Sequence, residues 1–285
     1  MDNPWVVVTG ASRGLGLHLI RSFWGAGWNV ALVARSQGAL SQVVQELPKS
    51  TNQVAITFCC DLSRPEAVNS LISQISNKLP RLNALINNAA IHGPIGPLVK
   101  NDLTFWNEAI QVNLLAPVAL CHGLIPLMSS PSGGLIINLS GGGATGPRAN
   151  FTAYASAKAA LVRFSETLAQ EVHALRIRVN CIAPGAMKTA LLEEVVTSGM
   201  MASGKHEFDI AEKVFYQGGA SMDKVSDLVL FLTSDPGSGI TGKLISAVWD
   251  RWLEWPKHID ELQTSDAYTL RRITGRERAM GWGDV

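Results

Sequence analysis

Residues 5–16, WVVVTGASRGLG, decide the fold of this chain. Trp5–Thr9 is a short apolar run that predicts a buried strand, and a helical pattern begins at Leu15. Glycines at positions 10, 14 and 16 lie between strand and helix. A glycine-rich turn lets backbone N–H groups approach a pyrophosphate, and the helix N-terminus adds partial positive charge. This stretch therefore predicts the first βα unit of a dinucleotide-binding sheet.

Short apolar runs continue to alternate with longer helical patterns as far as residue 250. The other runs that predict strands are 29–34, 54–59, 84–87, 135–139, 178–182 and 243–248. The helical patterns are 15–25, 37–47, 65–78, 103–128, 153–174 and 223–233. Apolar strands separated by amphipathic helices favour a parallel sheet covered on both faces. We expect one α/β domain over residues 1–250, a doubly wound, mostly parallel, seven-stranded Rossmann-like sheet, and a C-terminal extension over 251–285.

Composition excludes several classes of function. The 285 residues are 47% hydrophobic and 16% charged, as in a compact globular protein, and the net charge of +1 favours neither nucleic acid nor an anionic membrane as partner. The four cysteines, without C-x-x-C spacing, predict neither a metal site nor a disulfide framework. We find no signal segment and no run near the roughly 20 apolar residues of a membrane helix. We expect a soluble, cytoplasmic protein.

Tyr154 and Lys158, in AYASAKAALVRF, lie four residues apart in a predicted helix. That spacing places both side chains on one face, with the ammonium close to the phenol. A phenol has a pKa near 10, and a neighbouring cation lowers it toward neutral pH. By itself, such a pair is usually a half-buried aromatic beside a solvated charge. The rest of the chain must build a site around it.

TGASRGLG and the YxxxK pair together resemble the short-chain dehydrogenase/reductase family, in its single-domain branch. The resemblance covers about residues 5–250, and further motifs follow in the family's order: Asp61-Leu62, Asn87-Asn88-Ala89, Asn113 and Pro184-Gly185 with Thr189. Ala90 stands where the family has a glycine after NNA. The resemblance implies a nicotinamide dinucleotide held by Gly10, Ser12, Arg13, Gly14, Leu15, Gly16, Arg35, Asp61, Leu62, Asn88, Ala89, Tyr154, Lys158, Pro184, Gly185 and Thr189.

The choice of dinucleotide depends on charge near the second strand. An acidic residue at its end would bind the ribose 2′-OH and repel a 2′-phosphate. By resemblance that position is Ala34, followed by Arg35, and Arg13 adds a second cation. Arginine suits bidentate phosphate binding. We expect NADP(H) to be preferred over NAD(H).

The resemblance also implies the chemistry. Tyr154 would be the general acid or base for a carbonyl or alcohol oxygen, and Lys158 would lower its pKa and hold the nicotinamide ribose. Asn113 would support a proton relay from Lys158, or it would only bond a neighbouring carbonyl. The family's serine lies thirteen residues before the tyrosine, which is Gly141 here.

The displaced serine leaves several candidates. Ser140 precedes Gly141, and a one-residue shift along a strand reverses the side-chain direction. A bulge in Gly141–Gly143 would turn Ser140 back toward the substrate. Otherwise Thr145, Asn138 or a backbone N–H does its work.

The leading hypothesis is an NADP(H)-dependent oxidoreductase acting on a ketone/secondary alcohol. The alternative is a dinucleotide-binding sensor or scaffold with little turnover, and sugar-nucleotide epimerase or dehydratase chemistry ranks below both. Residues 186–221 are an irregular insertion that forms either a mobile substrate lid or a variable surface loop. The tail, with Trp249, Trp252, Trp255 and Trp282, packs on the domain or on a second subunit. We expect a homodimer or homotetramer acting on a small molecule of unidentified structure.

Overall fold

The structure, a computed structural model, describes residues 3–128 and 133–280 and contains one parallel sheet of seven strands. The strands are β1 (Trp5–Thr9), β2 (Asn29–Ala34), β3 (Ala55–Cys59), β4 (Ala84–Asn87), β5 (Gly134–Leu139), β6 (Ile177–Ala183) and β7 (Leu244–Ser246). Their order is β3-β2-β1-β4-β5-β6-β7. The predicted fold class is confirmed. The largest difference at a strand is β7, which is shorter than the predicted run at 243–248.

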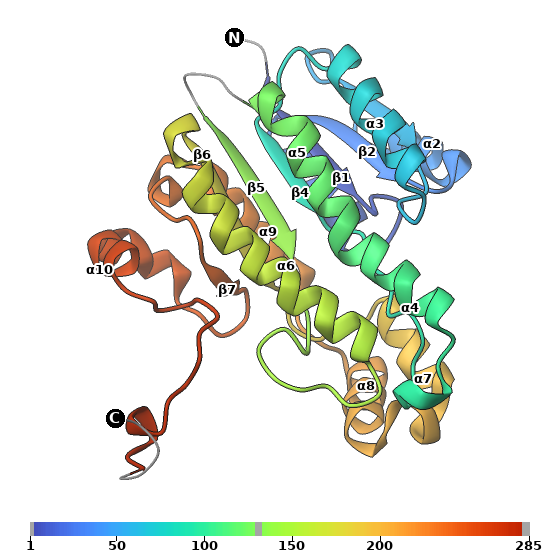
Figure 1. Ribbon diagram of the computed structural model, residues 1–285. Helices are drawn as coiled ribbons and strands as arrows, with labels where there is room; N and C mark the ends of the chain where they lie inside the picture. The colour runs from blue at the N-terminus through green and yellow to red at the C-terminus, as the bar shows by residue number, and fades with distance from the viewer. Residues whose placement is uncertain (1–2, 129–132, 281–285) are drawn as a thin grey trace.

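Helices cover both faces of the sheet (Figure 1), because alternate side chains of its apolar strands point to opposite sides. Val6 and Val8 of β1 join the core on one face, and Val7 joins the core on the other. The first face is covered by α1 (Gly14–Gly25), α2 (Gln37–Glu46) and α9 (Met222–Thr233). The second is covered by α3 (Pro65–Lys78), α5 (Ala116–Met128) and α6 (Thr152–Glu171).

The helix predicted at 103–128 is divided. It comprises α4 (Leu103–Ile110), a π-helical segment (Gln111–Leu115) and α5. Together they form a continuous helical stretch of 26 residues with a mean hydropathy of 1.6 in its most apolar window, long and apolar enough to cross a membrane. The expectation that no segment is long and apolar enough for a membrane helix is therefore wrong. The inner side of α5 packs against the sheet through Leu120 and Leu124, as a core helix of an α/β domain does.

Residues 186–221 contain two helices, so the expectation of an irregular insertion is wrong, and the substrate lid stays a prediction. Thr189 caps α7 (Ala190–Ser203), and its side chain accepts a hydrogen bond from the N–H of Leu192. Gly204, with φ of +84°, separates α7 from α8 (Lys205–Gln217). Figure 1 shows both helices at the carboxyl ends of the strands. They cover the edge of the sheet where ligands bind in open α/β folds.

The described part of the tail lies against the β7 edge and α6. It contains two 3₁₀ helices (Trp252–His258 and Arg276–Arg278) and α10 (Ile259–Thr264). The carbonyl of Tyr268 accepts a hydrogen bond from Leu244 N–H, and Lys243 Nζ donates to the carbonyls of Ser265 and Ala267. The tail thus occupies part of an otherwise open sheet edge. Trp282 lies outside the described residues.

Candidate active site

A cavity of about 750 Å³ opens at the carboxyl ends of the strands. It lies where the strand order reverses between β1 and β4, the position at which doubly wound sheets bind ligands. Every cofactor residue predicted from the sequence lines this cavity except Gly185. Gly185 instead lies against Val248 and Ala220, which an added Cβ would approach to 2.9 and 3.0 Å.

The glycine turn is closed tightly against β4. A Cβ on Gly16 would lie 2.1 Å from the carbonyl oxygen of Gly10, so no side chain fits there. Gly10 has φ of +67°, a region that favours glycine. Thr9 Oγ1 accepts hydrogen bonds from the N–H groups of Asn88 and Ala89, both at 3.0 Å. These contacts fix the loop after β4 to the end of β1, beside the start of α1, where a pyrophosphate would bind.

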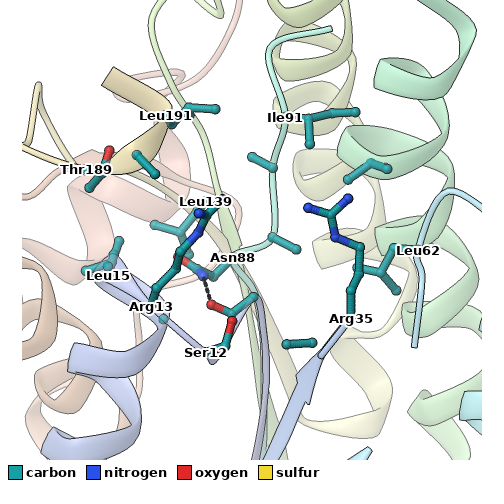
Figure 2. A pocket seen from close by; sticks show the side chains of 18 of the residues that line it. Ser12, Arg13, Leu15, Arg35, Leu62, Asn88, Ile91, Leu139, Thr189 and Leu191 are labelled. Atoms are coloured by element: carbon teal, nitrogen blue, oxygen red, sulfur yellow. Dashed lines mark hydrogen bonds between the residues drawn. The ribbon is translucent and has the colours of Figure 1, made fainter. Parts of the chain in front are cut away.

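Arg13 and Arg35 lie on opposite sides of the cavity (Figure 2). Both are exposed, and Ala34, which precedes Arg35 at the end of β2, is buried. Asp61 lies on the same side as Arg35. Partial burial raises the pKa of this carboxyl, but hydrogen bonds from Ser63 and the charge of Arg35 outweigh it and hold the pKa below its usual value. Arg13 and Arg35 thus line the cavity from two sides, and the Asp61 carboxylate lies near Arg35.

Tyr154 and Lys158 also line the cavity, both on α6 and both buried. Lys158 Nζ is 5.6 Å from the centroid of the Tyr154 ring and donates a 2.7 Å hydrogen bond to the carbonyl of Leu139. Burial lowers the pKa of Lys158 to about 8. The predicted pair is thus in one place, beside the carboxyl end of β5.

In this geometry the pKa of Tyr154 is raised rather than lowered, and the effect of Lys158 on the phenol stays a prediction. Burial raises the pKa of Tyr154, and the charge that partly offsets this rise belongs to Arg148. The reason is that desolvation penalises the phenolate, and this cost exceeds the effect of the neighbouring charge. Spacing along the helix predicted that Tyr154 and Lys158 are neighbours, but it did not predict the burial that raises the pKa of Tyr154.

Gly141 explains why the serine is absent from its usual position. A Cβ at Gly141 would lie 2.2 Å from the hydroxyl oxygen of Tyr154. The Tyr154 hydroxyl therefore lies against the bare Cα of this glycine. Of the alternatives, Thr145 is exposed, and Asn138 is engaged in hydrogen bonds with Asn87 and Ser165.

Ser140 itself lines the cavity next to this contact. Its N–H donates to the carbonyl of Ile182 at 2.8 Å, which continues the sheet. Its side chain is buried, and within the described residues its Oγ has no hydrogen-bond partner. A buried hydroxyl without a partner costs free energy, so this group is free to bond a ligand.

Asn113 lies at the centre of the π-helical segment and is fully buried. Its Oδ1 accepts from the N–H of Ile91 at 3.0 Å, and its Nδ2 donates to the carbonyl of the same residue at 2.7 Å. The side chain thereby fixes the loop after β4, and it does not line the cavity.

Two residues beside Tyr154 were not found from the sequence. The ring of His92 lies 5.0 Å from that of Tyr154, and the guanidinium of Arg148 lies 5.5 Å from it. Each is held by an acidic residue of α7 or α8: Glu194 on α7 bonds His92, and Glu207 on α8 bonds Arg148. No motif predicts these contacts, because their partners lie 102 and 59 residues away along the chain.

Comparison with known proteins agrees with this arrangement. The family model described as short chain dehydrogenase matches residues 4–198. The chain belongs to the short-chain dehydrogenase family. A short chain dehydrogenase of Pseudocercospora fijiensis is 35% identical over 193 residues, which are 67% of this chain and 62% of that protein. The uncharacterized oxidoreductase YciK of Escherichia coli is 34% identical over 194 residues, 67% of this chain and 76% of YciK.

Solved structures of the family share the fold. YwfH, an NADPH-dependent reductase involved in bacilysin biosynthesis, has a TM-score of 0.76 at 25% identity, with 86% of this chain and 97% of YwfH covered. A short chain dehydrogenase of Shigella flexneri complexed with NADP has a TM-score of 0.73 at 28% identity, with 87% and 98% covered. The protein is therefore an oxidoreductase of a family that binds nicotinamide cofactors and acts on small molecules.

Proposed function

We propose that the protein is an NADP(H)-dependent oxidoreductase that interconverts a ketone and a secondary alcohol, with Tyr154 as the general acid or base. The observation that carries this proposal is one cavity that Arg13 and Arg35 line from opposite sides and that the buried Tyr154–Lys158 pair also lines. The glycine turn, with no room for a side chain at Gly16, suits a pyrophosphate in this cavity.

Arg13 and Arg35 support the choice of NADP(H). A 2′-phosphate needs cationic donors, and Ala34 leaves no carboxylate to repel it at the end of β2. The similarity to YwfH and to the NADP complex from Shigella flexneri agrees with this preference.

When bound, the cofactor supplies or accepts a hydride at its nicotinamide ring. Reduction of a carbonyl builds negative charge on oxygen, and Tyr154 would donate a proton to that oxygen. Lys158 would bind ribose hydroxyls and, as a buried ammonium, favour an anion near the phenol. Ser140 Oγ, which has no hydrogen-bond partner within the described residues, would bond the substrate oxygen.

The test is NADPH consumption against a panel of ketones and keto-esters, for the wild type and for Tyr154→Phe. Turnover by the wild type and its loss in the variant, with NADPH binding retained, would support the proposal. Tight NADPH binding without turnover on any compound would favour a sensor, and equal or better turnover with NADH would refute the cofactor preference.

A further inference from the structure

Charged and titratable groups from several elements face the Tyr154 ring. Arg148 comes from the turn before α6, Lys158 from α6 itself, and His92 from the loop after β4. Helices α7 and α8, which we call the lid, contribute Glu194, which bonds His92, and Glu207, which bonds Arg148. Any proton transfer at Tyr154 takes place in the field of these five groups.

Arg148 is held rigidly beside the phenol. Its guanidinium lies 3.9 Å from the centroid of the Phe151 ring and 5.5 Å from that of Tyr154. Its Nε and Nη2 each lie 2.8 Å from the same carboxylate oxygen of Glu207. The Arg148 side chain is 14% exposed and that of Glu207 is 22% exposed, so water screens the pair weakly.

The other two basic groups near the ring have partners of their own. Lys158 Nζ donates to the carbonyl of Leu139. Burial lowers the pKa of His92, although its hydrogen bond with Glu194 opposes the change, and the lowered pKa favours the neutral imidazole. Arg148 therefore adds a second positive charge beside the Tyr154 ring, and it is the one that is paired with a carboxylate of α8.

We propose that Arg148 is a positioning residue whose charge favours the ionised form of Tyr154, and that Glu207 on lid helix α8 opposes this effect while the lid is closed. The lid would then control the acid strength of the catalytic group as well as access to it. Separation of Glu207 from Arg148 exposes the phenol to the full field of the guanidinium. This inference rests on the proposed role of Tyr154.

The first experiment is the pH dependence of kcat/KM for the four variants Arg148→Met, Arg148→Lys, Glu207→Gln and Asp209→Asn. Arg148→Met should move the limb that reports Tyr154 to higher pH, and Glu207→Gln should move it to lower pH, each by on the order of one pH unit. Arg148→Lys should restore the wild-type position. Asp209→Asn is the matched control, because Asp209 forms an exposed ion pair with Lys205 on the same helix.

Opposite directions for the Arg148 and Glu207 variants are the decisive result. Shifts in the same direction, or a uniform loss of activity with the limb unmoved, would overturn the proposal and leave Arg148 a structural role. If Arg148→Met does not fold, the direction found for Glu207→Gln decides by itself.

A second readout needs no turnover. The chain has three tyrosines, and the Tyr216→Phe/Tyr268→Phe protein leaves Tyr154 as the only source of tyrosinate absorbance. At the highest pH where circular dichroism shows an intact fold, the ionised fraction should rank Glu207→Gln above wild type above Arg148→Met. Equal fractions or the reverse order would overturn the inference. If the ionised fractions follow the predicted order but the protein turns over no substrate, the effect of Arg148 and Glu207 on Tyr154 is supported and only the proposed function is contradicted.

Discussion

Replacement of Gly141 by alanine tests the position of the Tyr154 hydroxyl. The added Cβ would lie 2.2 Å from Tyr154 Oη and 3.0 Å from Cζ, whereas ordinary contacts begin at 3.4 Å. The phenol must therefore move by about 1.2 Å, the difference between 3.4 and 2.2 Å. Tyr154 is buried within a helix against Phe151 and His92, so it cannot move without displacing other groups.

The expected loss follows from this displacement. A shift of about 1 Å in a reacting group costs on the order of 100-fold in rate. Gly141→Ala should therefore lower kcat by about 100-fold. It should leave the dissociation constant for NADPH unchanged, because the glycine turn, Arg13 and Arg35 line the cavity and Gly141 does not. The assay is steady-state turnover together with NADPH titration followed by fluorescence.

Gly142→Ala is the matched control. Its Cβ would meet only the Arg148 side chain, at an ordinary 3.8 Å. Its turnover should stay within about a factor of two of the wild type, as for substitutions that meet no obstruction. If Gly141→Ala turns over as fast as Gly142→Ala, the contact between Tyr154 and Gly141 does not position the acid and the reasoning fails.

Three further predictions concern cofactor, stability and assembly. Arg35→Glu should lower kcat/KM for NADPH by at least about tenfold and raise that for NADH; an unchanged ratio would remove Arg35 from the cofactor site. Lys158→Met should raise the free energy of unfolding by on the order of 1 to 3 kcal/mol at pH 7 and by less at pH 9. The reason is that the pKa of Lys158 is about 8 in the folded protein, so the unfolded chain binds more protons between pH 8 and about pH 10. The wild type therefore becomes more stable as the pH rises through this range. Equal gains at pH 7 and pH 9 in urea titrations would contradict this. By resemblance to the family, we expect the homodimer to form through the helices predicted at 103–128 and 153–174. Phe105 on α4 is 57% exposed, and Phe105→Glu should convert this dimer to monomers in light scattering. A wild type that is already monomeric would contradict this interface.

The sequence predicts the fold and most of the cavity well, because both depend on local patterns. Apolar runs at 5–9 and 29–34 become strands with the predicted bounds. TGxxxGxG lies between strand and helix, where only glycine fits at position 16. Such features depend on neighbours in the chain and need no knowledge of distant contacts.

The sequence could not predict features that depend on tertiary packing. Gly199 and Gly204 favoured an irregular loop, but Gly199 marks a kink and Gly204 the boundary of two packed helices. The direction of the Tyr154 pKa depends on burial and on Arg148, and neither follows from the spacing of Tyr154 and Lys158. Residue identity shows which charges are available, and only the fold shows where they point.

The most direct test of the proposed chemistry is deuterium transfer from NADPH labelled at nicotinamide C4 to a ketone substrate. The wild type should produce an alcohol that carries the deuterium on its carbinol carbon, and Tyr154→Phe should bind labelled NADPH equally well and produce none. An alcohol without the label, or the same rate of labelled product from Tyr154→Phe, would contradict a hydride transfer assisted by Tyr154.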